Sequence, residues 1–433
     1  MWHSAAASFA ILFSAILFAG FDRLSAESVG AADMAAKSAD AKPALDNTEK
    51  TADGDAVSSS DLYHYKGAIA LAEAAVSTAN EAAASKGSGG VLSESIQQRK
   101  LTQREQTLWQ GAIENLSSIS AQSPLYGRAS AKQREYQKHL ADTVRRLAAT
   151  DRAFLPLVIR DTGLNPKPLH ITLCKLDEST SVPLLDASGQ LDHTRCHHHQ
   201  GDERLASAAS LIKVPIAIAL TTKVSEEDLS LSEPVFVDPG NFTENGGNQP
   251  IEVGHEYPLE EVMDQMIQGS DNIGTNQLID YLGYTHINQS LSKLGYARTT
   301  VGHKLIGDKA RPANFGNGVN QTNTNDITAM MAQLYSAPRP GDDAILTALS
   351  NQQDTELGHD ALKDMGSDVE LIGEKTGQNN LVLGSTLAME IGGDRYVLTA
   401  AIAHDGNVDA LRRLITGIAV YLSENGFSPA SRG

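Results

Sequence analysis

An uninterrupted apolar run at residues 214–220, V-P-I-A-I-A-L, constrains the fold of this chain more than any other feature. A helix that is apolar on every side has to lie inside a domain, because none of its faces is suited to water. Ser210 and Lys213 precede the run, and residues three apart lie on one face of a helix. The sequence therefore predicts a buried helix whose first turn brings a hydroxyl group and an amine together.

The Ser210–Lys213 pair has the chemistry of an activated nucleophile. A serine hydroxyl group is a weak nucleophile until an adjacent base takes its proton. A lysine amine that is partly stripped of water loses its own proton more easily and can act as that base. An S-x-x-K pair also occurs by chance, so its interpretation depends on the motifs that follow it.

Length and net charge limit the number of domains and the kinds of partner that the chain can have. Its 433 residues allow two or three domains with a substantial core. The formal net charge is −18 and the sequence contains no basic tract, which argues against nucleic acid as a partner.

The N-terminal segment predicts export. Residues 5–21 are almost wholly apolar, which suits the apolar region of a signal peptide and is short for a membrane span. Leu24-Ser25-Ala26 offers a small-residue cleavage site, so we expect residues 1–26 to direct the chain to the periplasm or cell envelope. The apolar region is not preceded by Lys or Arg, and an uncleaved N-terminal anchor stays open as an alternative. Residues 27–60 have few bulky apolar side chains and indicate a disordered linker.

Helical periodicity predicts a small helical domain at residues 61–155. Three amphipathic segments are expected, over residues 62–76, 108–119 and 129–147. The pattern around Trp109 and Tyr136 resembles one tetratricopeptide-type helical hairpin, although fewer than three repeats are visible. Trp109 and Tyr136 are interpreted as packing residues of a small bundle, so this domain supports a spacer or protein-contact role.

Strand patterns stand at both ends of a predicted domain at residues 156–428. The expected strands are residues 169–174, 182–185, 371–372, 382–390 and 396–402, with a closing helix at 408–422. Helical patterns fill residues 205–331 between them. This order predicts an α/β (α+β) class, in which one antiparallel sheet built from both ends of the domain is flanked by an inserted all-helical subdomain.

Two polar clusters in this domain can carry chemistry. Ser270, Asp271 and Asn272 stand between two helical patterns, where they either cap the second helix or relay a proton and hold a substrate carbonyl. The segment Lys375-Thr376-Gly377 is either a surface strand that ends in a glycine turn or a cation site for a substrate carboxylate. In the second case Gly377 would let the substrate backbone come close.

The motifs S-x-x-K, S-D-N and K-T-G, in this order, resemble the signature of the penicillin-recognising serine enzymes. The intervals of 60 residues from Ser210 to Ser270 and of 105 residues from Ser270 to Lys375 are similar to those of class A β-lactamases. The resemblance covers residues 169–422 and includes Asn276, which matches a structural asparagine of the family. It implies a β-lactamase/transpeptidase-like fold that needs no metal or other cofactor.

The resemblance also implies a catalytic role for three side chains. Ser210 would be the acylated nucleophile, and Lys213 its base. Ser270 would pass a proton to the leaving nitrogen.

Further residues would hold the substrate. Asn272 would bind the side-chain amide of the substrate, and Lys375 and Thr376 would bind its carboxylate. The backbone N–H groups of Ser210 and Gln378 would form an oxyanion hole, which stabilises charge that appears only in the tetrahedral state.

One loop departs from the family pattern. Class A enzymes carry E-x-x-x-N between S-D-N and K-T-G, and its Glu activates the deacylating water. This chain has no Glu between Glu261 and Glu356. If Asn320 is the loop asparagine, Gly316 stands four residues before it, and if the motif intervals are kept instead, the acid falls near Asp308. The resemblance therefore implies acylation followed by slow deacylation.

The implied function is that of an exported serine hydrolase that opens β-lactams through an acyl-enzyme. Its partner would be a small-molecule β-lactam or a peptidoglycan-peptide-like substrate. Two alternatives stay open: a D-Ala-D-Ala peptidase or esterase of the envelope, and a non-catalytic scaffold with a vestigial hydrolase fold that makes protein contacts through residues 61–154.

The two cysteines and a neighbouring histidine run are weaker signals. Cys174 and Cys196 are the only cysteines, and an exported chain can join them in a disulfide. Residues 197–199 are all histidine, but successive strand residues point to opposite faces. We interpret this run as solvated and expect no metal site.

Overall fold

A computed structural model describes residues 57–85, 90–176, 184–186, 191–192, 194–244, 250–307 and 309–428. The predicted signal peptide, residues 27–56 of the predicted linker and Asp308 lie outside these residues. The chain divides into two compact units, residues 1–67 with 115–132 and residues 68–114 with 133–433. This division does not separate residues 61–155 from 156–428, so the domain boundaries drawn from the sequence stay a prediction.

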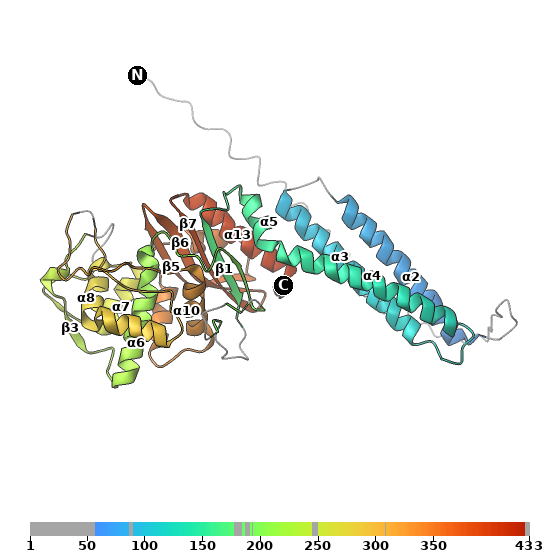
Figure 1. The fold of residues 1–433 in the computed structure, drawn as a ribbon, viewed down its shortest axis with the longest axis horizontal. Coiled ribbons are helices and arrows are strands. Elements are labelled where there is room, and N and C mark those ends of the chain that lie inside the picture. Colours follow the sequence, from blue (N-terminus) through green and yellow to red (C-terminus); the bar gives the residue numbers. More distant parts are fainter. Residues whose placement is uncertain are drawn as a thin grey trace, which may run out of the picture. The chain divides into compact units, whose positions relative to one another are not determined.

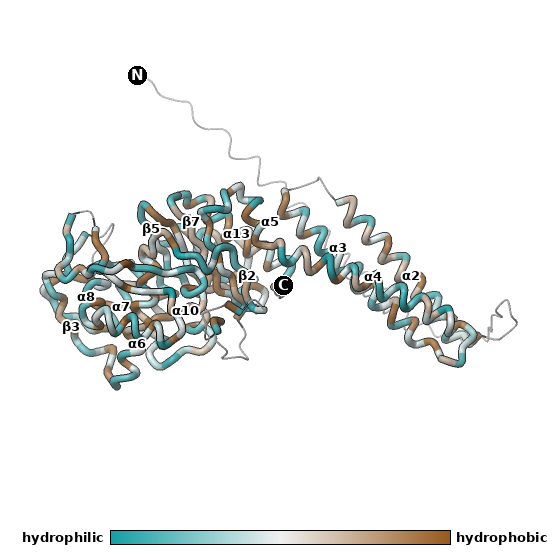
Figure 2. The backbone as a smooth tube through the Cα atoms, viewed as in Figure 1, coloured by the Kyte–Doolittle hydropathy of each residue, from teal (hydrophilic) through white to brown (hydrophobic). Residues whose placement is uncertain are grey.

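Three long helices confirm the helical segments predicted in the N-terminal half. They are α2 (Ser59–Ala84), α3 (Val91–Ser117) and α4 (Tyr126–Arg152), and the short helix α5 (Phe154–Thr162) follows. Figure 2 shows hydrophilic and hydrophobic residues interleaved along α3 and α4, as expected for amphipathic helices. The tetratricopeptide-like repeat stays a prediction. Along the described part of the chain, no helix has the length and apolar character that a bilayer crossing requires.

Each unit has its own polar contacts between helices. In the first unit, the backbone N–H of Ser120 donates to Asp61 at 3.1 Å. In the second unit, Trp109 stacks on His139 with the ring centroids 4.7 Å apart, and its indole N–H donates to the buried Glu105. Trp109 and Tyr136 are both buried, which confirms their packing role.

One antiparallel sheet is built from both ends of the predicted catalytic domain, as expected. Its strands are β1 (Leu169–Lys175), β2 (Cys196–His199), β5 (Val369–Asn379), β6 (Val382–Ile391) and β7 (Asp394–Ala403), in the order β2-β1-β7-β6-β5. Of the strand predicted at residues 182–185, residues 182–183 lie outside the described residues, and β1 pairs with β2. Leu185 forms only an isolated bridge with Leu191. The histidine-rich β2 lacks the apolar alternation by which a strand is predicted.

The sheet lies between two helical layers (Figure 1). Helices α5, α12 (Gly358–Leu362) and α13 (Val408–Asn425) pack on one face, and α10 (Thr324–Ser336) packs on the other. Successive strand side chains point to opposite faces, so Leu169, Ile171 and Leu173 join the core beneath α13.

The inserted subdomain carries the predicted buried helix. Its elements are the 3-10 helix η2 (Ala209–Ile212), α6 (Lys213–Glu227), β3 (Pro234–Phe236), the 3-10 helix η3 (Pro239–Asn241), β4 (Glu256–Pro258), α7 (Leu259–Gln268), α8 (Asn272–Leu282), α9 (Tyr284–Lys293) and α11 (Asp342–Ser350). Residues 214–220 of α6 are all buried, which confirms the interpretation of the apolar run.

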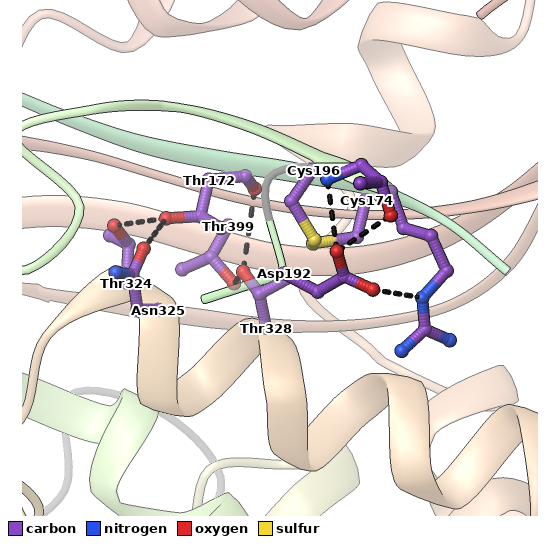
Figure 3. Close-up of a disulfide and its surroundings, with 10 residues drawn as sticks. Thr172, Cys174, Asp192, Cys196, Thr324, Asn325, Thr328 and Thr399 are labelled. Carbon is purple, nitrogen blue, oxygen red and sulfur yellow. Dashed lines mark hydrogen bonds and ion pairs between the residues drawn. A yellow bond between two sulfur atoms is a disulfide. The ribbon is translucent and has the colours of Figure 1, made fainter. Parts of the chain in front are cut away.

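A disulfide joins two strands of the sheet, and a group of polar side chains joins the sheet to α10 (Figure 3). Cys174 and Cys196 face each other across β1 and β2 and form the disulfide that the sequence allowed. On the same face, Thr328 of α10 donates to Thr399 at 2.8 Å, and Thr172 donates to Asn325 at 2.7 Å. The disulfide therefore fixes β2 to β1, and the hydrogen bonds fix the sheet against α10.

Candidate active site

Ser210 lies in η2, at the entrance to the buried helix α6. It is half-buried, and its hydroxyl group makes no hydrogen bond to another described residue. The preceding residue, Ala209, has a φ of 43°, a left-handed conformation that side-chain-bearing residues rarely adopt. Such strain is typical of functional sites, and here it turns the chain just before the proposed nucleophile.

Lys213 is fully buried one turn later and makes three hydrogen bonds through Nζ. It donates to the carbonyl oxygen of Ser270 at 2.5 Å, to Ser270 Oγ at 3.0 Å and to Asn272 Oδ1 at 2.9 Å. Burial and the nearby charge of Lys375 lower the pKa of Lys213 well below its usual value, and Asp271 opposes this shift. The site therefore makes this amine easier to deprotonate than a solvated lysine.

A neutral Lys213 changes the direction of one of these bonds. A neutral amine has two N–H donors and one lone pair, whereas the ammonium has three donors and none. Of the three partners of Nζ, only Ser270 Oγ carries a proton to donate. A proton can therefore move between Lys213 and Ser270.

The S-D-N segment serves both as a helix cap and as part of the site. Asp271 accepts from the backbone N–H of Gly274 at 2.7 Å and so caps α8. Ser270 has a φ of 55°, and both its carbonyl oxygen and its hydroxyl group face Lys213. The capping alternative thus applies to Asp271, while Ser270 and Asn272 contact the buried amine.

Lys375 approaches the same hydroxyl group from the edge strand β5. Its Nζ donates to Ser270 Oγ at 3.2 Å and to the carbonyl oxygen of Thr376 at 2.9 Å. Burial lowers the pKa of Lys375 to about 8, and the negative charges of Asp354 and Glu374 oppose the shift. The three sequence motifs thus meet at one atom, Ser270 Oγ.

Gly377 is required by the packing of β5 on η2. A Cβ atom at this position would lie 2.8 Å from the backbone nitrogen of Leu211 and 3.1 Å from that of Ser210. The glycine therefore lets β5 pack closely on η2, and the close approach of a substrate backbone stays a prediction. Gln378, the second predicted oxyanion donor, follows Gly377 on β5 and is exposed.

The loop after α9 is fixed at three points. Asn276 on α8 makes two hydrogen bonds to the backbone of Leu305, at 2.7 and 3.0 Å. Asn320 accepts from the N–H of Gly302 at 2.8 Å and donates to the carbonyl oxygen of His303 at 3.0 Å. Asn320 thus closes the base of the loop.

A buried cation provides the third attachment of this loop. Lys304 Nζ donates to Asp280 at 2.7 Å, to Asn241 Oδ1 at 2.6 Å and to the carbonyl oxygen of Ala313 at 2.6 Å. The role of Lys304 was not predicted, because no pattern in the sequence distinguishes a buried lysine from a solvated one.

The loop position next to Asn276 is apolar. Leu305 is held there, and the following residue, Ile306, is 48 % exposed. Gly316 packs against Gly302, since a Cβ atom at Gly316 would lie 2.3 Å from the carbonyl oxygen of Gly302.

The histidine run is less solvated than expected. His197 is buried between the rings of Phe154 and Phe427, and its Nε2 lies 2.7 Å from the carbonyl oxygen of Ser428. The solvated interpretation is therefore wrong for His197. Within the described ranges, no group of three or more His, Cys, Asp or Glu side chains is arranged to hold a metal ion.

Comparisons with known proteins match the predicted catalytic domain. The model of the beta-lactamase enzyme family matches residues 191–423. A beta-lactamase from Sphaerobacter thermophilus DSM 20745 has a similar structure, with 20 % identity and a TM-score of 0.51 over 65 % of this chain and 99 % of that one. PBP-A is similar at 22 % identity and a TM-score of 0.50 over 62 % of this chain and 94 % of its own. Comparison with curated proteins finds no match.

Proposed function

The chain belongs to the beta-lactamase enzyme family, whose model matches residues 191–423, and from this premise we propose that it is a serine hydrolase that opens β-lactams through an acyl-enzyme on Ser210. The observation that carries the proposal is the buried Lys213, whose pKa is lowered and whose Nζ contacts Ser270 Oγ at 3.0 Å. Strongly perturbed groups are typical of active sites, and this amine contacts two residues of the S-D-N motif.

Acylation uses the residues in a fixed order. Neutral Lys213 takes the proton of Ser210, whose oxygen bonds to the lactam carbonyl carbon. As the carbon–nitrogen bond breaks, Ser270 gives its proton to the leaving nitrogen and regains one from Lys213. The backbone N–H groups of Ser210 and Gln378 stabilise the negative oxygen of the tetrahedral state.

Deacylation is the slow step in this proposal. It requires a base to activate water, and such help contributes about 100- to 10,000-fold. Where Asn276 holds the loop, the chain carries Leu305 and Ile306, neither of which is a base. Asp308 follows two residues after Ile306, but its side chain is shorter than that of Glu, and in this proposal Lys213 serves for both steps.

A D-Ala-D-Ala peptidase or esterase is the second candidate. It requires the same acylation by Ser210, and the apolar Leu305–Ile306 segment favours it, because rapid release of a β-lactam acyl group is not then needed. Both candidates would act in the periplasm or cell envelope. The disulfide between Cys174 and Cys196 supports export, since structural disulfides persist in oxidising compartments.

Burst kinetics with a chromogenic cephalosporin test the proposal. We expect an initial release of product equal to the amount of enzyme, followed by slow turnover. A parallel assay of D-alanine release from an acyl-D-Ala-D-Ala peptide separates the two candidates. Absence of both a burst and D-alanine release would contradict an acylating enzyme and would favour the scaffold alternative.

A further inference from the structure

The exposed carboxylate of Asp354 contacts Thr376, which the sequence analysis expects to bind the substrate carboxylate. Thr376 donates its hydroxyl proton to Asp354 Oδ2 at 2.7 Å. Asp354 lies in the turn between α11 and α12, far from the three motifs in sequence, and its charge also acts on Lys375. Asp354 is thus part of the surroundings of the proposed substrate anchor.

Lys375 and Thr376 have few hydrogen-bond donors left for a substrate carboxylate. Thr376 has one hydroxyl proton, and Asp354 accepts it. A protonated Lys375 has three N–H groups, of which two donate to Ser270 Oγ and to the carbonyl oxygen of Thr376. One N–H of Lys375 therefore remains for a substrate carboxylate, whereas a carboxylate ordinarily accepts several hydrogen bonds.

The negative charge of Asp354 also disfavours a substrate carboxylate at this position. A substrate carboxylate that contacts Thr376 would lie within a few Å of the Asp354 carboxylate, and two like charges at that range repel each other. An uncharged group with an N–H is a better complement, because it can donate to Thr376 Oγ1 or to Asp354 while its carbonyl oxygen accepts from Lys375.

We propose that Asp354 is a specificity-determining residue, which disfavours substrates with a free carboxylate at the Lys375–Thr376 anchor and favours substrates with an amide N–H there. The substrate class is a peptide or lactam whose carboxyl group is amidated or continues as a peptide bond. This inference rests on the proposed acylation of Ser210 and extends it to the choice of substrate.

A purely structural role for Asp354 makes a different prediction. Its second oxygen accepts from the backbone N–H of Glu356 at 3.1 Å, which would stabilise the turn whatever substrate is bound. A residue that only holds this turn would affect all substrates alike. The two roles are therefore separated by comparing substrates that differ at one group.

The test compares benzylpenicillin, its methyl ester and its carboxamide. The rate of acylation is followed by intact mass in the wild type and in Asp354→Asn, which keeps the side-chain shape and removes the charge. Glu356→Gln removes an equal charge from an exposed side chain two residues away and is the matched control.

We expect the wild type to react faster with the carboxamide than with the methyl ester. At a pH well below 8, where Lys375 keeps its charge in both proteins, the rate with benzylpenicillin should rise about tenfold in Asp354→Asn relative to the rate with the ester, as the loss of a nearby like charge predicts. The Glu356→Gln control should leave the ratio of the three rates unchanged. Equal effects of Asp354→Asn on all three compounds would overturn this inference and leave the proposed function intact. Failure of all three compounds to acylate the wild type would overturn the proposed function itself.

Discussion

Lys213 Nζ lies 3.0 Å from Ser270 Oγ, although the two residues are 57 positions apart in the chain. The contact joins the start of α6 to the turn before α8. This hydrogen bond connects the proposed base, Lys213, to the proposed proton donor, Ser270. A proton can therefore pass directly from one to the other. The effect of removing either group therefore tests the mechanism directly.

Ser270→Ala should slow acylation by at least about 100-fold, because it removes the hydroxyl group that carries a proton to the leaving nitrogen. The rate is measured by intact mass with a penicillin. Thermal unfolding should change little, since the half-buried hydroxyl contacts only amines and leaves no buried charge unpaired. Acylation at the wild-type rate would exclude Ser270 from the proton transfer.

The pH dependence of acylation should show a descending limb near pH 8 for a substrate with a carboxylate. The pKa of Lys375 is lowered to about 8, so above that pH Lys375 loses the charge that attracts such a substrate. The charge of Asp354 raises this pKa, and Asp354→Asn should therefore move the limb to lower pH. The kcat/KM profile measures both effects, and an uncharged ester substrate should lack the limb. A limb that stays in place in Asp354→Asn would contradict this coupling.

Ile306→Glu should speed deacylation by placing a carboxylate beside the loop position that Asn276 holds. A base that reaches the acyl group through one water contributes about 100-fold or more. The lifetime of the penicillin adduct measures the change, and Ile306→Gln, which has the same shape but no base, should leave it unaltered. Equal lifetimes in the two variants would show that the loop does not reach the acyl group.

Lys304→Met should destabilise the chain by about 2 kcal/mol, since it leaves the fully buried Asn241 Oδ1 without its donor and Asp280 without its partner. Denaturant unfolding measures the loss. Lys100→Met is the matched control, because the Lys100–Glu424 pair is solvent-exposed and such pairs contribute about 1 kcal/mol or less. Similar losses in both variants would contradict a special role for the buried cation.

Much of the fold followed from patterns that lie within short stretches of chain. Residues 214–220 have no polar face, so burial was the only outcome, and the antiparallel sheet followed from apolar strands at both ends of the domain. The strand β2 was missed because His197 and its neighbours are polar, and it is held by pairing to β1 and by the disulfide.

The site was predictable only where a motif stands in the sequence. The three motifs could be read in order, and Ser270, Lys213 and Lys375 do meet. Asp354 was missed because its contact with Thr376 depends on how the turn before α12 folds back on β5. No local pattern encodes such a contact.

Intact-mass analysis of the whole chain with benzylpenicillin, followed over time, tests the central claim most directly. The account predicts one covalent adduct of the mass of the intact penicillin, formed rapidly on the wild type, persisting through slow deacylation and absent from Ser210→Ala. An adduct that forms equally on Ser210→Ala, or a wild type that never acquires one, would contradict it.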